Sequence, residues 1–123
     1  MNTQHYFSKH HLWIQLNQDG TCDAGISEHA QQMLGDIVYV EAPAIGQHIM
    51  AEQTCGIVES VKTASDLHAP VSGTVIATNE NVLNSPELLD DAPEEHWIFR
   101  IRADDVDDIK TLMNKAAYEA FVA

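Results

Sequence analysis

The clearest pattern near the start of the chain is an alternation of apolar and other residues. Leu12, Ile14 and Leu16 occupy every second position, so their side chains share one face of an extended segment. Asp19-Gly20 then gives a turn signal, and Thr21–Ile26 has the composition of a returning strand. The pattern predicts a β-hairpin with one buried face.

A short helix is expected directly after this hairpin. Ser27 is a good N-cap, because its hydroxyl can accept a hydrogen bond from a backbone N–H of the first turn. Ala30, Met33 and Leu34 follow at helical spacing and should share one face. Gly35 is suited to end the helix, since glycine readily adopts the left-handed backbone conformation found there.

The middle of the chain has the composition of short strands. Asp36–Glu41 is rich in β-forming residues. Cys55–Val61 and Leu67–Ile76 are two further apolar, β-branched runs, and Lys62 lies in the short stretch between them. The simplest interpretation is a pair of strands joined by a turn that carries this lysine.

The last third of the chain contains a turn, one strand and a helix. Ser85-Pro86-Glu87 has the N-cap and the first-turn proline of a helix start, and Trp97–Ile101 is expected to be the last strand. A single helix is predicted from Asp104 onward, with an apolar face formed by Val106, Ile109, Met113, Ala116 and Ala120. These elements predict one mainly β domain over residues 1–123, with a short early helix and a C-terminal helix.

Composition and charge narrow the class of partner. The chain has 123 residues and a net charge of −13, from 6 Lys+Arg against 19 Asp+Glu. Nucleic acid and anionic membranes do not attract such an acidic protein, whereas basic patches on partner proteins do. No apolar run approaches the roughly 20 residues that span a bilayer, and Met1–His11 lacks a signal-peptide pattern. We therefore expect a cytoplasmic protein of bacterial type, with a processed mitochondrial form as the alternative, and neither a nucleic-acid nor a membrane partner.

Cysteines and histidines form no recognisable catalytic or metal-binding motif. Cys22 and Cys55 belong to no CxxC pair and are interpreted as two free thiols. The seven histidines include no HxxxH or HExxH spacing, so no metal site is expected. A nucleophile–base pair and a glycine-rich phosphate loop are also missing from the sequence, and no catalytic residue is predicted.

Lys62 is the residue with the clearest chemical potential. Of the four lysines, Lys9 lies near one end of the chain, and Lys110 and Lys115 fall on the polar side of the predicted C-terminal helix. Lys62 is the one lysine expected at a turn between two apolar strands. A tethered acyl carrier needs a protruding ε-amine on a rigid platform, and a tight hairpin provides both.

The residues around Lys62 belong to a longer series of motifs. The segment Val58–Gly73 reads VESVKTASDLHAPVSG, and four more stretches accompany it in the same order as in a known family: Ile26–Gln31, Leu34–Asp36, Ser85–Leu88 and Ala117–Glu119. Together they resemble the glycine cleavage H proteins over about Tyr6–Phe121. Several ordered matches over one domain are far more specific than an isolated ESVK.

The resemblance implies a fold, a cofactor and a set of partners. H proteins adopt a flattened antiparallel β-sandwich of the lipoyl/biotinyl hammerhead type and carry covalent lipoate, here expected on Lys62. In the family cycle, a pyridoxal-phosphate-dependent glycine decarboxylase loads an aminomethyl group and a tetrahydrofolate-dependent aminomethyltransferase removes it. An FAD-dependent dihydrolipoamide dehydrogenase reoxidises the dithiol, and a lipoyl-attaching enzyme installs the arm. The implied role is a non-catalytic carrier, because the reactions belong to cofactors on the partners.

The resemblance also implies three sets of site residues. The attachment motif surrounds Lys62 and comprises Glu59, Ser60, Val61, Ser65 and Asp66. The turn glycines are Gly46 and Gly73, and the cleft that docks the arm comprises Leu12, Glu28 and His29. Family members usually have His-Glu-Trp where this chain has His11-Leu12-Trp13. A leucine cannot pair with the cationic aminomethyl group, so the loaded arm is expected to be held more weakly unless Glu28 or Asp66 compensates.

Two alternative functions are compatible with the same residues. An H-like protein can relay lipoyl groups to other enzymes or serve a redox system. An H-like scaffold without an arm can act as an interaction module, in which case Lys62 is an ordinary solvated turn residue. The intact mass of the protein separates the unmodified module from both carriers.

Overall fold

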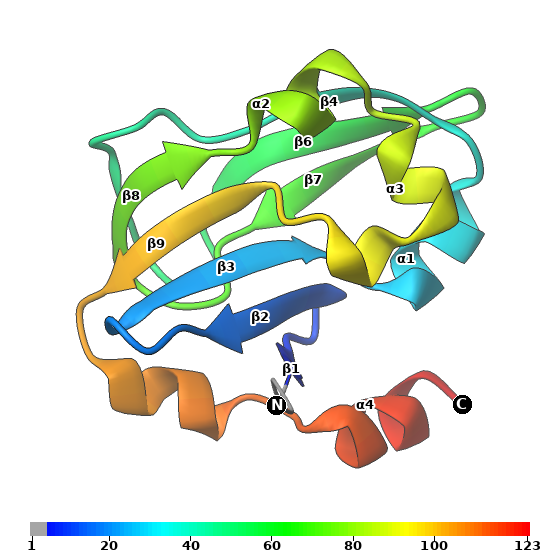
Figure 1. The fold of residues 1–123 in the computed structure, drawn as a ribbon. Helices are drawn as coiled ribbons and strands as arrows, with labels where there is room; N and C mark the ends of the chain where they lie inside the picture. The colour runs from blue at the N-terminus through cyan, green and yellow to red at the C-terminus, as the bar shows by residue number, and fades with distance from the viewer. Residues whose placement is uncertain (1–4) are drawn as a thin grey trace.

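The computed structural model describes residues 5–123 and contains two antiparallel sheets that pack against each other (Figure 1). Residues 1–4 of the Met1–His11 segment interpreted above lie outside the described residues. The larger sheet has six strands in the order β1 (His5–Phe7), β2 (Leu12–Leu16), β3 (Thr21–Ile26), β9 (Phe99–Ala103), β8 (Gly73–Thr78) and β5 (His48–Ile49). The smaller sheet has three strands in the order β4 (Ile37–Glu41), β6 (Thr54–Ser60) and β7 (Ala64–His68). The predicted mainly β sandwich is confirmed.

Short helices connect and flank the sheets. The α-helices are α1 (Glu28–Leu34), α2 (Glu80–Asn84), α3 (Leu88–Asp91) and α4 (Lys115–Val122), and the 3₁₀ helices are η1 (Pro93–Glu95) and η2 (Val106–Thr111). Helix α4 lies beside β1 at one end of the larger sheet (Figure 1). No helix among residues 5–123 is both long and apolar enough to cross a membrane.

The first predicted hairpin is confirmed, and the structure adds a strand to it. Strands β2 and β3 pair antiparallel, with Leu12 opposite Ile26. Strand β1 joins them, with Tyr6 opposite Ile14, although the sequence pattern did not indicate it. The outer side of β2 is also covered, because Trp13 is buried in a small cluster with Phe7 and Tyr118.

Helix α1 follows the prediction at both ends and along its apolar face. The Ser27 Oγ accepts a hydrogen bond from the Ala30 N–H at 3.1 Å, and Gly35 has a φ of 86°. Ala30, Met33 and Leu34 line the same small groove, so their predicted shared face is confirmed. Ala30 and Leu34 are buried and Met33 is 51% exposed, because a helix that rests on a sheet buries only a narrow stripe.

The strands beyond Lys62 were predicted with the wrong boundaries. Ala64, Ser65 and Asp66 belong to β7, and the run Leu67–Ile76 is split between the end of β7 and the start of β8. Pro70 lies at the break, where the chain leaves the smaller sheet and enters the larger one. Proline has a fixed φ and no N–H for a ladder hydrogen bond, so it suits this crossing between the sheets.

The last third of the chain required two corrections. The helical turn predicted at Ser85-Pro86-Glu87 is present, since the Leu88 N–H donates to the Ser85 carbonyl at 3.0 Å, and it leads into α3, while Ser85 also caps the C-terminus of α2. The last strand begins at Phe99 instead of Trp97. The single helix predicted from Asp104 is split into η2 and α4. The split occurs because Met113 exchanges two backbone hydrogen bonds with Phe7 of β1, at 2.7 and 3.0 Å.

The predicted apolar face of the last helix is replaced by a different set of contacts. Ile109 is fully buried, but Val106 is 38% exposed, and the alanines predicted to pack lie on the surface. Tyr118 is instead the buried residue of α4, where its ring stacks on Phe7 with centroids 4.5 Å apart. An aromatic anchor of this kind buries a large apolar area and still leaves a hydroxyl for hydrogen bonding.

Candidate functional site: an exposed lysine hairpin beside a groove

The hairpin of β6 and β7 places Lys62 in solvent. The last ladder pair is Glu59 with Ala64, and the turn closes with a hydrogen bond from the Ser60 N–H to the Thr63 carbonyl at 2.7 Å. Lys62 is exposed at the tip, as the sequence predicted. A lysine in this position is accessible to a modifying enzyme, and its backbone is held by the sheet.

Ser60 holds the hairpin tip from inside. Its side chain is buried, and its Oγ accepts hydrogen bonds from the backbone N–H groups of Lys62 at 3.3 Å and Thr63 at 3.1 Å. The same hydroxyl donates to the Thr63 carbonyl at 3.2 Å. The hydroxyl therefore ties the backbone of Lys62 and Thr63 to the end of β6, which fixes the conformation around Lys62.

The junction between α1 and β4 supports the tip from one side. The Val61 N–H donates to the Asp36 carbonyl at 3.0 Å, while the Val61 side chain is 70% exposed. The Lys62 stem runs past Gly35, where an added Cβ would lie 3.4 Å from the lysine Cε. The lysine therefore starts from a fixed place next to the C-terminal end of α1.

Carboxylates accompany the hairpin on its outer surface. Glu59 alternates with the buried residues Val58 and Ser60, so it points to the opposite face, where it pairs with Tyr39 on β4. The nearby carboxylate of Glu41, helped by Glu59, raises the pKa of Tyr39. This face is accordingly acidic and suited to a partner with basic residues.

A small groove of about 70 Å³ lies between α1, β2 and the β6–β7 hairpin. Its floor and walls are mainly apolar, and its lining residues are His10, His11, Leu12, Ile26, Ala30, Met33, Leu34, Val58, Ser65, Asp66 and Leu67. Three predicted site residues meet here, because Leu12 forms part of the floor and Ser65 and Asp66 form the β7 side. Leu12 is only 1% exposed and belongs to the main core, so it is mostly a packing residue.

The structure places the other two predicted cleft residues outside this groove. Glu28 and His29 line a separate hollow of about 200 Å³ beneath α4, together with Tyr118. The Glu28 backbone N–H donates to the Glu94 carboxylate at 2.9 Å. His29 lies 5.1 Å, ring to ring, from His11. Burial, followed by the charges of His29 and His10, lowers the pKa of His11.

The two predicted turn glycines have different physical roles. Gly46 lies in a turn with a φ of 91°, and its N–H donates to the Val75 carbonyl at 2.7 Å. Gly73 is the first residue of β8, where an added Cβ would meet the Arg102 carbonyl oxygen at 2.5 Å. Gly46 is thus required for its left-handed backbone, and Gly73 for the close approach of β9.

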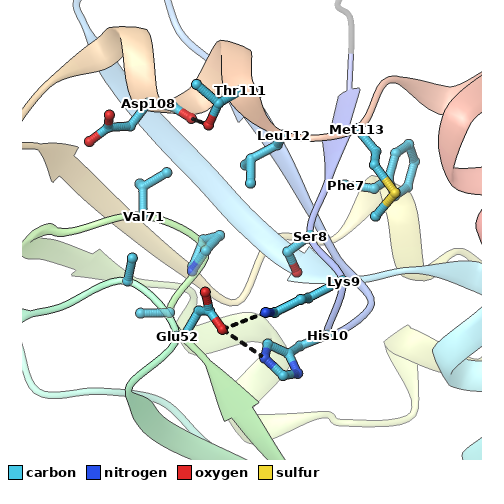
Figure 2. Close-up of a pocket in the computed structure, with 13 residues that line it drawn as sticks. Phe7, Ser8, Lys9, His10, Glu52, Val71, Asp108, Thr111, Leu112 and Met113 are labelled. Atoms are coloured by element: carbon cyan, nitrogen blue, oxygen red, sulfur yellow. Dashed lines mark hydrogen bonds and ion pairs between the residues drawn. The ribbon is translucent and has the colours of Figure 1, made fainter.

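A larger cavity, of about 470 Å³, is not lined by any of the predicted site residues. It lies between the β1–β2 turn, the segment around Val71, and η2 (Figure 2). At its edge, the Glu52 Oε1 forms an ion pair with the Lys9 Nζ at 2.9 Å and lies 3.7 Å from the His10 Nε2 (Figure 2). Glu52 also has a φ of 71°, which is unusual for a side-chain-bearing residue.

The remaining titratable groups add no obvious reaction centre. Burial raises the pKa of Cys22 to about 12 and that of Cys55 to about 11, so both are poor nucleophiles. Both thiols are free, as the sequence predicted. Among residues 5–123, no group of three His, Cys, Asp or Glu side chains is arranged to hold a metal ion.

Two packed antiparallel sheets with a lysine at an exposed hairpin tip define a β-sandwich of the lipoyl- and biotinyl-carrier class. The family model described as Glycine cleavage H-protein matches residues 5–123. The chain therefore belongs to the glycine cleavage H-protein family, which confirms the resemblance stated from the sequence.

Individual relatives support the same assignment. The chain is 48% identical to a glycine cleavage system H protein from Alkalilimnicola ehrlichii, over 95% of this chain and 91% of the relative. It is 44% identical to the Escherichia coli glycine cleavage system H protein, over 94% of this chain and 91% of the relative. Among solved structures, a glycine cleavage system H protein from Mycobacterium marinum matches with a TM-score of 0.87 and 28% identity, over 98% of this chain and 97% of that chain.

Sequence reasoning missed part of the groove. His11 and Met33 line it, and Tyr118 contacts His11 from behind, with its hydroxyl 2.8 Å from the His11 Nδ1. Met33 was predicted on the apolar face of α1, but the groove on that side of the helix was not predicted. Tyr118 carried only part of a signal, because α4 contains two large aromatic residues, Tyr118 and Phe121, and the sequence does not say which of them anchors the helix.

Proposed function

We propose that this chain carries lipoate on Lys62 and acts as the mobile-arm carrier of a glycine cleavage system. The observation that carries the proposal is the exposed lysine at a hairpin tip whose backbone is fixed by Ser60 and Asp36. Membership in the H-protein family supports the choice of lipoate over other acyl groups. The proposal treats residues 1–123 as one carrier domain that works in the cytoplasm.

The residues present fit a lipoyl group. The Lys62 amine is accessible for amide formation, and the groove beside the hairpin is lined largely by apolar side chains that suit a hydrocarbon arm. When bound, the lipoyl group supplies a dithiol that accepts and gives up an aminomethyl unit. The chain itself holds the attachment point rigid, offers an apolar rest for the arm, and shields it partly from water.

Different residues serve attachment and docking in this proposal. Glu59 and Val61, beside the lysine, contact the lipoyl-attaching enzyme, and Ser60 keeps the tip in the conformation that this enzyme recognises. Ser65 and Asp66 form the polar side of the groove that receives the arm. Glu28 and His29 support the groove from behind, because His29 lies against His11.

The acidic surface determines the kind of partner. The net charge of −13 and the carboxylates beside the hairpin favour enzymes with basic rims around their active-site entrances. The proposed partners are glycine decarboxylase, the folate-dependent aminomethyltransferase and dihydrolipoamide dehydrogenase. The carrier gains rate by raising the local concentration of its bound group, so weak and brief docking to each partner is sufficient.

Intact-mass spectrometry tests attachment. The full chain expressed with lipoate and a lipoyl-attaching enzyme should gain about 190 Da, as expected for one lipoyl amide. Lys62→Arg should abolish the gain, and Lys110→Arg, a matched change on an exposed lysine of η2, should retain it. A gain that persists in Lys62→Arg, or no gain in the unaltered chain, overturns the proposal and favours an interaction module.

A reaction assay distinguishes glycine cleavage from a lipoyl relay. The lipoylated chain should support exchange of labelled bicarbonate into the carboxyl group of glycine by the decarboxylase, and Lys62→Arg should not. A chain that is lipoylated but supports no exchange, and instead passes its lipoyl group to another carrier domain, serves the relay function.

A further inference from the structure

A single hydroxyl of the C-terminal helix joins two segments that build the groove. The Tyr118 Oη lies 2.7 Å from the Ser27 Oγ and 2.8 Å from the His11 Nδ1. Tyr118 is 4% exposed and Ser27 is fully buried, so water does not compete at the centre of this arrangement. The ring is held in place independently, because it stacks on Phe7.

Ser27 and His11, the two hydrogen-bond partners of Tyr118, both position residues that line the groove. Ser27 is the N-cap of α1, which contributes Ala30, Met33 and Leu34 to the groove. His11 lines the groove directly, and its carbonyl accepts the Ser27 N–H at 2.9 Å. His11 also has a φ of 69°, a strained conformation that persists only where surrounding contacts enforce it.

The hydrogens can be assigned by counting donors and acceptors. Within residues 5–123, the Ser27 hydroxyl makes two hydrogen bonds. It accepts one from the Ala30 N–H and shares the other with the Tyr118 hydroxyl. Ser27 therefore uses its proton best by donating to the Tyr118 Oη. Tyr118 then donates to the His11 Nδ1, which must be unprotonated to accept. The reverse order leaves the buried Ser27 proton without this acceptor, which is unfavourable.

We propose that Tyr118 is a positioning residue for the arm groove, because its hydroxyl fixes the start of α1 and holds His11 as the neutral tautomer with its proton on Nε2. This inference rests on the proposed docking of the arm in that groove. In this arrangement, His11 presents one defined donor in place of two interchanging tautomers. The C-terminal helix thereby contributes to arm docking without touching the arm.

Nitrogen NMR of histidine rings in the unmodified chain tests the tautomer. The titratable groups that surround His11 are His10 in the same turn, His29 on α1 and Tyr118 on α4, and burial lowers the His11 pKa. At about pH 8, above the lowered pKa of His11, its imidazole is neutral, so the two ring nitrogens report the tautomer directly. The His11 Nδ1 should show the shift of an unprotonated nitrogen. Tyr118→Phe should produce a mixture of both tautomers.

A second measurement connects the tautomer to the groove. In the lipoylated, reduced chain, Tyr118→Phe should increase the rate at which iodoacetamide alkylates the arm by about three- to tenfold, the effect of losing one net hydrogen bond. Tyr39→Phe is the matched control, because among residues 5–123 the Tyr39 hydroxyl bonds only to the exposed Glu41, at 3.3 Å. It should change neither the His11 spectrum nor the alkylation rate.

The outcomes separate this inference from the proposed function. A protonated His11 Nδ1 in the unaltered chain, or an alkylation rate in Tyr118→Phe equal to that of Tyr39→Phe, overturns the positioning role. Absence of the lipoyl mass gain in the unaltered chain overturns the carrier proposal instead, whereas the tautomer measurement does not depend on lipoylation. The circular dichroism spectrum of Tyr118→Phe should match that of the unaltered chain, which shows that the variant is folded when the two are compared.

Discussion

Replacement of Ser60 by alanine removes one oxygen from inside the hairpin tip. The Ser60 hydroxyl accepts from the Lys62 and Thr63 backbone N–H groups and donates to the Thr63 carbonyl, and the side chain is 8% exposed. The backbone bond from Ser60 to Thr63 remains, so the hairpin persists and its tip loosens. The effect should therefore be concentrated at the residues that flank the amine.

The loss of stability in Ser60→Ala depends on whether the backbone groups of Lys62 and Thr63 that lose their partner are exposed to water. A net hydrogen bond contributes about 0.5–1.5 kcal/mol, and the full penalty applies only to groups that stay buried. Lys62 and Thr63 are exposed, so water can replace part of what Ser60 supplied. We expect a loss of about 1 kcal/mol in the free energy of unfolding, and a fall of roughly 4 °C in Tm for a chain of this size.

Urea unfolding gives the global value, and hydrogen exchange gives the local one. The Lys62 and Thr63 amides should exchange about fivefold faster in Ser60→Ala, as expected for a local loss of about 1 kcal/mol. Ser65→Ala is the matched control, because it removes the same atom from an exposed residue of the same hairpin. Equal unfolding energies and equal exchange at these amides in the two variants refute the role given to Ser60.

Three further perturbations have expected outcomes. Gly73→Ala should lower the free energy of unfolding, measured in urea, by about 2–3 kcal/mol, because the added Cβ would meet the Arg102 carbonyl at 2.5 Å. Gly20→Ala is the comparison: its Cβ would meet nothing within 4 Å, so it should lose only about 1 kcal/mol, from its positive φ. Equal losses in the two variants contradict the close approach at Gly73. Leu12→Glu places a carboxylate where Leu12 is 1% exposed, so thermal unfolding should show a larger loss of stability at pH 8 than at pH 5, and equal losses contradict burial. Burial lowers the pKa of His11 below its usual 6.5, so the unfolded chain takes up this proton first as the pH falls, and His11 destabilises the fold progressively below pH 6.5. In His11→Asn, the free energy of unfolding measured in urea should therefore depend less on pH in this range. An unchanged pH dependence contradicts the lowered pKa of His11.

The sequence predicted the parts of the fold that depend on neighbouring residues. The β2–β3 hairpin, the Ser27 cap and the Gly35 stop each rest on a local rule, and the structure confirms all three. Lys62 was found in the same way, since a lysine between two β-branched runs indicates a hairpin tip. The ordered family motifs then supplied the chemistry that a solvated turn lysine alone does not imply.

The errors occurred where distant segments decide the local conformation. The predicted terminal helix breaks at Met113 because that residue pairs with β1, more than a hundred positions earlier in the chain. The contact of His11 with Tyr118 spans 107 positions and leaves no trace in the local pattern. Leu12 was assigned to the arm cleft through the resemblance, but in the structure it is a core residue whose edge reaches the groove.

The residues that hold the hairpin tip differ from the residues that hold the groove proposed to receive the arm. Ser60 and Asp36 fix the hairpin tip through backbone hydrogen bonds, whereas Tyr118 fixes the groove through Ser27 and His11. These two networks share no residue, so the tip can be recognised by an attaching enzyme without disturbing the groove. A carrier that visits several enzymes benefits from this division, because the arm must leave its rest repeatedly while its attachment point remains unchanged.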